Sequence, residues 1–333
     1  MRLNILRASD FVSGVLFFCA LMLFAAPSAV VAGDGWEVIS DTSFRNGFAL
    51  LPPDFKTIRE KGGVEKAIAD TLVFSSSSAA PSWRIAQWHS RYSLARSIAE
   101  KKKSFLETGK NYAREYANET KRIERSQQGT LLLEINTAPE YEHPRRQGEQ
   151  WPHLLVEQDF ARRPNMGRVE SLAFTMALKL VSCVRSMPDS EYDPALHTVQ
   201  SPLFFILKNT NRQSADYNKF IWLGIPSYDY RYHNMFIHEI VSWDVASNTY
   251  IYNIPQIDVW GDIHFDDGKW HRLSVDILPY VRECLNYMKE KGFFTATSLS
   301  DLEITGMNFG WEAPGAFHAA IALKGLSLYA REK

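Results

Sequence analysis

The sequence predicts an all-β protein, an antiparallel β-sandwich with one or two peripheral helices. Short runs rich in aliphatic and aromatic residues recur along the chain, separated by turn residues, and this pattern is typical of strands. Regular helices do not alternate with these runs, so parallel βαβ units are not expected. We expect about ten to fourteen strands. The clearest lie at residues 129–136, 153–158, 172–181, 203–209, 250–254, 270–276, 302–308 and 319–329.

The composition excludes several classes of protein. Of 333 residues, 45% are hydrophobic, and 37 basic residues nearly balance 38 acidic residues. An ordinary apolar content with little net charge argues against a disordered chain. Because no basic excess is available to neutralise phosphates, we do not expect nucleic acid as a partner. A single β-sandwich domain over residues 33–333 is expected.

Residues 1–32 have the features of a secretory signal peptide. Arg2 and Arg7 precede an apolar stretch at residues 12–26. Pro27 ends this stretch, and the small residues of Val30-Val31-Ala32 fit a cleavage site before residue 33. A retained anchor is the alternative, although the stretch is short for a membrane span of about 20 residues. We therefore expect a secreted or periplasmic protein without a transmembrane span after cleavage.

One helix interrupts the strand pattern. Leu278, Val281, Leu285 and Met288 recur at helical spacing. Asp276 precedes them and can cap the helix. We expect this helix to cover one end of the sandwich.

Three further features give local predictions. Residues 95–127 mix acidic and basic side chains, which favours an exposed, partly helical excursion from the sheet. Asp267-Gly268 fits a tight hairpin turn. Cys183 and Cys284 remain in the exported chain, either as one disulfide or as two free thiols.

The strand beginning near Trp151 carries the first candidate ligand site. Side chains alternate between the two faces of a strand. The even positions from residue 152 to 160 are mostly apolar and are expected in the core, so Trp151, His153, Glu157 and Asp159 share the other face. A ring that stacks on sugar C–H groups beside groups that bond hydroxyls suits a carbohydrate. The alternative is the ordinary polar outer face of a sandwich. Arg146 lies just upstream and can share the site.

Two other clusters join the candidate list. Tyr228, Asp229 and Arg231 follow a strand broken by glycine and proline, and an aspartate–arginine pair beside tyrosines can bind a polyhydroxylated ligand or form a structural ion pair. Trp311 and Glu312 lie in a turn-rich segment, where the tryptophan either faces a sugar or folds onto the core. Trp83 and Trp88 are five residues apart, which places them on opposite faces of a strand.

Catalytic and metal motifs are mostly missing. No zinc-protease motif, nucleophile elbow or phosphate-binding glycine loop occurs. For a glycosidase, the carboxylate pairs Glu157 with Asp159 and Glu134 with Glu157 are candidates. A lyase would need His153, Tyr228 and Arg146 to converge in one groove. We expect no cofactor. Structural calcium is conceivable at Asp258, Asp262, Asp266 and Asp267, although their spacing is not that of an EF-hand.

Several segments resemble a group of exported bacterial proteins that have no assigned activity. The segments are Trp83–Trp88, Arg146–Gln158, Trp222–Arg231, Trp270–Asp276 and Asn308–Glu312. The resemblance implies one β-sandwich of the jelly-roll or concanavalin A-like type, shared with lectins, carbohydrate-binding modules and jelly-roll lyases. It implies no catalytic residue. The chain lacks the Tyr-x-Lys-x-Gly-x-Tyr-x-Gln strand associated with jelly-roll alginate lyases.

The sequence therefore predicts an exported carbohydrate-binding β-sandwich, without catalysis, whose partner is a polysaccharide or other glycan. A polysaccharide lyase or glycoside hydrolase on the same fold is one alternative. An envelope protein with a structural or interaction role is the other.

Overall fold

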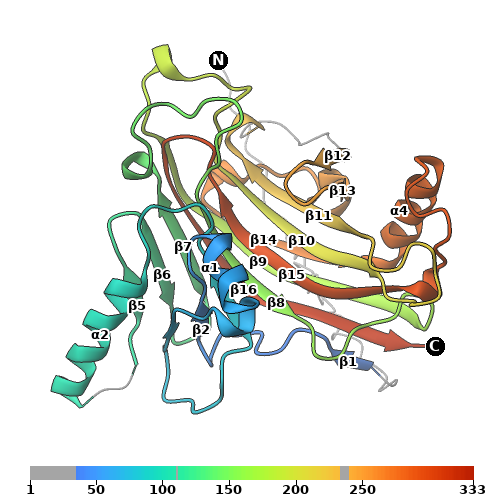
Figure 1. The fold of residues 1–333 in the computed structure, drawn as a ribbon, viewed down its shortest axis with the longest axis horizontal. Helices are drawn as coiled ribbons and strands as arrows, with labels where there is room; N and C mark the ends of the chain where they lie inside the picture. The colour runs from blue at the N-terminus through green and yellow to red at the C-terminus, as the bar shows by residue number, and fades with distance from the viewer. Residues whose placement is uncertain (1–34, 110–111, 233–239) are drawn as a thin grey trace, which may run out of the picture. The chain divides into compact units, whose positions relative to one another are not determined.

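Two β-sheets pack face to face and enclose one hydrophobic core (Figure 1). This arrangement confirms the predicted β-sandwich. The computed structural model describes residues 35–109, 112–232 and 240–333. The predicted signal peptide lies outside the described residues. The described chain contains sixteen strands, more than expected, because several are only three residues long.

The first sheet has seven strands, and every pairing in it is antiparallel. Its order is β14 (His271–Asp276), β9 (Val169–Arg185), β16 (Phe317–Glu332), β7 (Leu131–Asn136), β6 (Lys121–Arg125) and β5 (Glu115–Ala117), with β1 (Gly35–Glu37) beside the far part of β16. The long strand β16 therefore lies centrally, between β9 on one side and β7 and β1 on the other.

The second sheet has nine strands. Its order is β12 (Val241–Asp244), β13 (Thr249–Asn253), β11 (Phe220–Asp229), β10 (Gln200–Asn209), β15 (Leu302–Glu312), β8 (His153–Asp159), β4 (Trp83–Ala86), β2 (Phe48–Leu50) and β3 (Asp70–Leu72). Two pairings are parallel, β11 with β13 and β2 with β4. The other pairings in this sheet are antiparallel.

Strand alternation decides which side chains enter the core. Leu154 and Val156 of β8 are buried between the sheets, as their even positions predicted. Trp311 of β15 is fully buried, and its indole nitrogen donates to the carbonyl oxygen of Leu133 in the opposite sheet at 2.9 Å. This bond ties the two sheets together across the core.

Helices close the ends and one outer face of the sandwich. The predicted helix is confirmed as α4 (Leu278–Glu290), whose apolar stripe is buried. The Asp276 carboxylate accepts a hydrogen bond from the Leu278 amide at 3.0 Å. Helix α1 (Phe55–Lys61) lies over the outer face of the nine-stranded sheet, where Ile58 packs with Leu155. Other helical segments are α2 (Ala95–Thr108), α3 (Gln256–Trp260) and short 3-10 turns at Val64–Lys66, Ala138–Glu140, Asp189–Glu191, Tyr230–Tyr232, Phe265–Asp267 and Leu299–Asp301.

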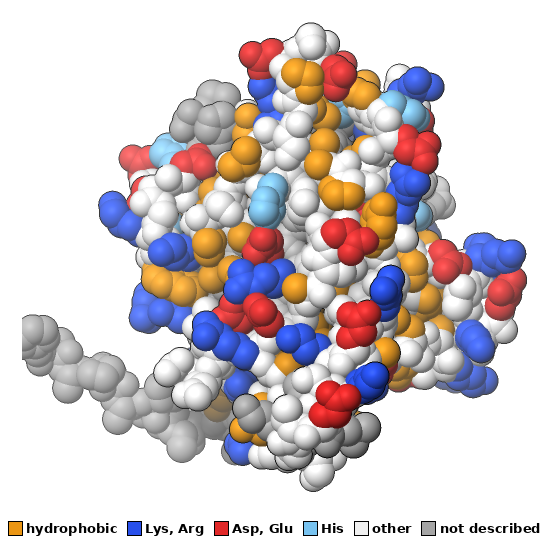
Figure 2. Space-filling model, turned by 90° about the vertical axis from the view of Figure 1, so that its left-hand side faces the viewer, with side chains coloured by type: hydrophobic (Ala, Val, Ile, Leu, Met, Phe, Trp, Pro, Cys, Tyr) orange, Lys and Arg blue, Asp and Glu red, His pale blue; other side chains and the backbone are white. Residues whose placement is uncertain are grey.

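The charged segment 95–127 differs from the predicted excursion. It begins with the predicted helix, α2, but then forms β5 and β6, which extend the seven-stranded sheet. Tyr116 and Ile123 are the inward positions of these strands and are fully buried. On the outer face, Arg122 pairs with Glu115 and Glu134. Figure 2, seen from the side of α2, shows acidic and basic side chains interspersed over this surface.

The structure decides two local predictions, one about a turn and one about the cysteines. Asp267 and Gly268 do not form a hairpin turn, because β13 belongs to one sheet and β14 to the other. Asp267 instead ends a 3-10 turn, and Gly268 takes a left-handed conformation after it. Cys183 on β9 and Cys284 on α4 are both free thiols.

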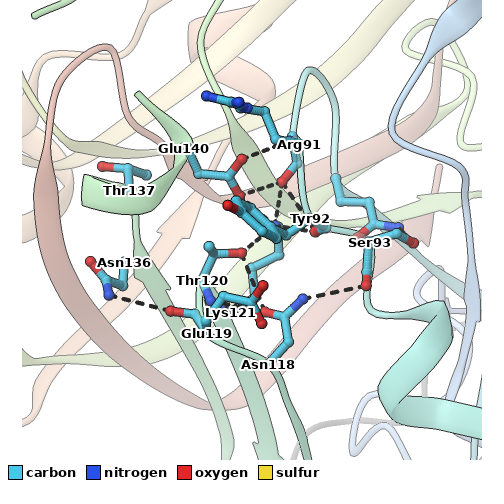
Figure 3. A network of polar contacts seen from close by, with 12 residues as sticks. Arg91, Tyr92, Ser93, Asn118, Glu119, Thr120, Lys121, Asn136, Thr137 and Glu140 are labelled. Carbon is cyan, nitrogen blue, oxygen red and sulfur yellow. Dashed lines mark hydrogen bonds and ion pairs between the residues drawn. The ribbon is translucent and has the colours of Figure 1, made fainter. Parts of the chain in front are cut away.

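A buried ion pair joins three segments at one end of the seven-stranded sheet (Figure 3). Lys121 of β6 and Glu140 have side chains that are 0% and 1% exposed, and Lys121 Nζ lies 2.9 Å from Glu140 Oε1. Lys121 Nζ also donates to the Tyr92 carbonyl at 2.8 Å and to Thr120 Oγ1 at 2.9 Å. The other carboxylate oxygen of Glu140 accepts from the Arg91 amide at 2.6 Å. Each charge is thus satisfied by partners from different segments.

We predict that Lys121→Met lowers the free energy of unfolding by about 3–5 kcal/mol, because it leaves the Glu140 carboxylate buried without a countercharge. Urea unfolding followed by circular dichroism measures this loss. The double variant Lys121→Met/Glu140→Leu should recover part of it. Lys56→Met, which breaks the exposed Lys56–Glu60 pair, should cost less than about 1 kcal/mol. Equal losses in Lys121→Met and Lys56→Met would contradict the prediction.

Candidate functional site

The outer face of the nine-stranded sheet carries a row of paired side chains that we call the central row. Strand register aligns Arg84 on β4 with Glu157 on β8, and Glu157 with Asn308 on β15. Asn308 is in turn opposite Phe204 on β10, which is opposite Gly224 on β11. Directly opposed residues on neighbouring strands project on the same face. The row therefore places an arginine, a carboxyl, an amide and an aromatic ring side by side.

Aromatic rings flank the polar part of the central row on both sides. Trp88 donates its indole hydrogen to Glu157 Oε1 at 3.3 Å and stacks on the exposed ring of Phe55, with centroids 4.5 Å apart. On the other side, the rings of Phe204 and Trp222 lie 5.8 Å apart. Gly224 makes this packing possible, because a Cβ there would lie 2.1 Å from Asn253 Oδ1 and 3.0 Å from the Phe204 ring.

Glu157 keeps its proton to a higher pH than an ordinary glutamate does. Burial raises the pKa of its carboxyl to about 7. The nearby Arg84 charge and the Trp88 hydrogen bond oppose this rise in pKa, and the Asp159 charge adds to it. Asp159, two positions further along β8, is exposed and pairs with Arg84 Nη2 at 2.9 Å. Two carboxyl groups of different environment therefore share this face.

A second row, which we call the end row, crosses the same face near one end of the strands. Register aligns His153 with Glu312, Glu312 with Gln200, and Gln200 with Asp229. Gln200 donates to Glu312 Oε2 at 2.9 Å. Arg231 follows Asp229 and bonds its carboxylate through Nε at 3.0 Å. Polar contacts thus join β15, β10 and β11 in this row, and His153 of β8 lies beside them by strand register.

Aromatic groups also border the end row. The ring of Trp151 stacks on His153 with centroids 5.8 Å apart, and Arg145 lies over the same indole at 4.8 Å. The ring centroids of His89 and His153 lie 5.9 Å apart. Burial is the larger cause that lowers the pKa of His89, and the nearby His153 adds to the effect. His89 also has a backbone φ of 57°, in the left-handed region that few side chains adopt. Contacts around His89 therefore hold its backbone in this conformation.

Four polar atoms of this surface are buried without a hydrogen-bond partner in the described structure. They are Arg84 Nε and Asn308 Oδ1 in the central row and Trp151 Nε1 and His153 Nδ1 at the end row. Buried polar groups in proteins are nearly always paired. Four of the seven unsatisfied buried side-chain atoms found among the described residues therefore gather on this face.

The structure brings seven of the ten sequence-predicted residues together. Trp151, His153, Glu157, Asp159 and Glu312 lie on or beside the outer face of β8 and β15, and Asp229 with Arg231 extends the end row. Those seven positions include Asp159 at the exposed end of β8.

 Asp159 lies outside both rows and contacts them through Arg84, whereas the other six belong to the rows or contact them directly.

The structure places the remaining three predicted residues elsewhere. Tyr228 and Trp311 face the core and are 4% and 0% exposed, so neither side chain lies on the outer face. On β11 a register shift lies between the pairs Ser201–Tyr228 and Pro202–Pro226, so Tyr228 faces the core and Asp229 takes the outward position. On β15, regular alternation turns Trp311 inward and Glu312 outward. Arg146 is exposed in the loop before β8, where its backbone amide donates to Glu149 Oε2 at 2.8 Å. The convergence that a lyase would need, of His153, Tyr228 and Arg146, is therefore absent from the described structure.

Sequence reasoning missed several residues of the two rows and their border, among them Arg84, Trp88, Gln200 and Asn308. A signal for two of them was available. Trp83 and Trp88 lie on opposite sides of the sheet as predicted, but Trp88 follows the end of β4 and is buried under α1 instead of being exposed. The inward Trp83 implies an outward Arg84. Assigning Trp311 to the core likewise implies outward positions for Asn308 and Glu312. For Gln200, only the pairing of distant strands reveals its neighbours.

No cofactor or metal centre is recognisable in the part of the chain that the structure describes. No group of three or more histidine, cysteine, aspartate or glutamate side chains is arranged to hold a metal ion there. Asp267, one of the conceivable calcium ligands, accepts hydrogen bonds from the Lys269 amide at 2.9 Å and pairs with His271 at 2.7 Å. Among the described helices, none has the length and apolar character needed to cross a membrane.

Comparison with known proteins shows similarity in structure alone. No family model matches the sequence, and no curated protein matches it either. An endoglucanase, cel12A from Rhodothermus marinus, aligns over 65% of this chain and 89% of its own, with 9% identity and a TM-score of 0.37. A family 12 xyloglucanase from Bacillus licheniformis aligns over 63% and 86%, with 10% identity and a TM-score of 0.37. The family 11 xylanase from Neocallimastix patriciarum aligns over 65% and 90%, with 9% identity and a TM-score of 0.35.

The raised pKa of Glu157 predicts a distinct pH dependence of stability. The unfolded chain releases this proton near its ordinary pKa of 4.5, whereas the folded protein keeps it until about pH 7. The unfolded state therefore binds fewer protons in this window, and the free energy of unfolding falls as pH rises through it. Relative to Glu157→Gln, the wild type should lose on the order of 2–3 kcal/mol between pH 4 and pH 7.5.

Urea unfolding of both proteins at a series of pH values measures this difference. Glu134→Gln, a glutamate of the opposite sheet that pairs with Arg122 and His318, controls for the general response to losing a carboxylate. If the free energies of unfolding of the wild type and Glu157→Gln changed in parallel across the whole pH range, the raised pKa of Glu157 would be contradicted.

Proposed function

We propose that the outer face of the nine-stranded sheet binds a carbohydrate chain. The observation that carries this proposal is the set of four buried polar atoms without partners, which lie beside aromatic rings in the two rows. Each unsatisfied buried group costs roughly 1–3 kcal/mol. A ligand that supplies the missing hydrogen bonds would recover this free energy.

The chemistry of these atoms matches a polyhydroxylated ligand. The missing partners include an acceptor for the Arg84 and Trp151 N–H groups and a donor for Asn308 Oδ1. A hydroxyl group donates and accepts at once, so sugars can satisfy both kinds of atom. The partly exposed rings of Phe204 and Trp222 provide apolar faces beside them, against which sugar C–H groups can pack.

The spacing of the two rows favours a polymer over a single sugar. Glu157 and His153 are four positions apart on β8, and so are Asn308 and Glu312 on β15. At a rise of about 3.4 Å per residue, the rows are roughly 14 Å apart. A ligand that contacts both rows must therefore extend along the strands over several sugar units.

Glycoside hydrolysis is the second candidate function, favoured by the raised pKa of Glu157 beside Asp159. Carboxylates two positions apart on one strand are separated by about 7 Å, within the range of about 6.5–9.5 Å used by inverting glycosidases. Glu157 would protonate the glycosidic oxygen as its bond to the anomeric carbon breaks. Asp159 would take a proton from the water that attacks this carbon. The alternative pair Glu134 with Glu157 is wrong, because Glu134 lies on the other sheet.

We predict that affinity electrophoresis through a panel of neutral and acidic polysaccharides retards the wild-type protein in at least one polymer. Asn308→Ala and Trp222→Ala should each raise the dissociation constant about tenfold, because each removes roughly 1–2 kcal/mol of contact with the ligand.

Two matched variants serve as controls for binding. Asn136→Ala alters an asparagine on β7 in the opposite sheet, and Trp243→Ala alters an exposed tryptophan on β12 outside both rows. Both should keep the wild-type retardation. Equal loss in the controls, or no retardation by any polymer, would reject the binding face.

Once a polymer that the protein binds is known, a hydrolysis assay on that polymer distinguishes a binding protein from a hydrolase. For the hydrolase, we predict new reducing ends on incubation with wild type, and a decrease of about 100-fold or more in Glu157→Gln and Asp159→Asn. Retardation of both variants in the gel should persist, because neither residue stacks on the sugar. Binding without new reducing ends would rule out hydrolysis of that polymer.

A further inference from the structure

A cavity of about 160 Å³ lies at the loop that joins β8 to β9, away from the central and end rows. The residues that line it come from β1, this loop, the start of β9, β15 and β16 and are Trp36, Arg162, Arg163, Arg168, Glu303 and Glu332, together with Asn165 and Val169. The loop therefore forms a polar cavity where the ends of both sheets meet.

The loop is held in place by its own backbone and by β15. Asn165 forms a β-bridge with Glu303, and its side chain donates to the Ser300 carbonyl at 2.8 Å and accepts from the Gly167 amide at 3.0 Å. A Cβ on Gly167 would lie 2.7 Å from the Cα of Ser300, so the loop approaches this segment closely. The lining side chains are thus presented by a fixed backbone.

The cavity has more positive than negative charge. Three arginines line it against the two carboxylates of Glu303 and Glu332. Arg162 pairs with Glu332 at 3.3 Å and lies over the Trp36 ring at 3.5 Å from its centroid. Arg163 and Arg168 are exposed, and neither forms an ion pair within the described residues. Two guanidinium groups therefore remain available to a ligand.

The unsatisfied atom of this cavity is a donor. The indole nitrogen of Trp36 is buried and has no hydrogen-bond partner in the described structure. Indole and guanidinium N–H groups donate and cannot accept. A ligand held by these groups would accept hydrogen bonds, and the excess of arginine favours one that is negatively charged.

We propose that this cavity binds an oxyanion, a sulfate, phosphate or carboxylate group. The planar fork of an arginine matches the oxygens of all three groups. The cavity equals the liquid volume of about five water molecules, at about 30 Å³ each, which suits one such group. The oxyanion is either a free inorganic ion or a substituent carried by a glycan. The proposal does not depend on carbohydrate binding at the outer face.

The test follows the indole N–H signal of Trp36 by NMR of the ¹⁵N-labelled protein, assigned with Trp36→Phe. Addition of inorganic phosphate or sulfate to about 50 mM should shift this signal in a saturable way, with chloride at equal ionic strength as the blank. The double variant Arg163→Gln/Arg168→Gln should raise the dissociation constant about tenfold or more. Arg272→Gln, an exposed arginine of β14, should bind as the wild type does.

A second arm distinguishes the sources of the oxyanion. Sulfated and uronate-containing oligosaccharides are compared with neutral ones in the same titration. A shift with the acidic oligosaccharides alone would identify the oxyanion as a glycan substituent, and a shift with the inorganic ions would identify a free anion. Absence of any saturable shift with both sets, or equal affinity in the double variant, would overturn the proposal.

Discussion

The burial of one face of the nine-stranded sheet is the constraint on which the rest of this structure depends. Trp83, Phe309 and Trp311 fill the core side of their strands and are 0–2% exposed. Because side chains alternate, each buried residue fixes an outward neighbour. Arg84, Asn308 and Glu312 face outward for this reason. The hydrogen bond from Trp311 to Leu133 in the opposite sheet holds this orientation, since rotating β15 would break it. The candidate site thus lies on strands whose orientation is fixed by the burial of their inner side chains.

Alternation within single strands accounts for what the sequence could predict. The β-sandwich, the eight clearest strands and α4 follow from short-range patterns, and so does the outward set on β8. Register between distant strands could not be derived in this way. Nothing local to Glu157 shows that Asn308, far along the chain, lies opposite it. The same limit applies to Asp267 and Gly268, where a local turn pattern suggested a hairpin, but β14 pairs with β9.

The two proposed sites differ in the property that selects their ligands. On the outer face, donors and acceptors lie beside aromatic rings, and burial raises the pKa of the Glu157 carboxyl to about 7. Such a surface discriminates by shape and hydroxyl pattern. In the cavity of the β8–β9 loop, the available groups are donors with positive charge, so charge selects the ligand and salt weakens it. Under the two proposals, the outer face would recognise neutral features of a ligand and the cavity would recognise charged ones.

The central position of β16 has a consequence for how the chain folds. This strand, residues 317–332, pairs with β9, β7 and β1, and the residues that it joins are separated by as many as about 300 positions. Contacts this distant in sequence slow folding, because closing a long loop costs chain entropy before the contacts can stabilise the structure. The seven-stranded sheet cannot assemble around its centre until residues 317–332 have been synthesised. Before β16 is in place, β9 and β7 each lack a neighbouring strand on the side where β16 pairs with them, and unpaired strand edges are prone to aggregation.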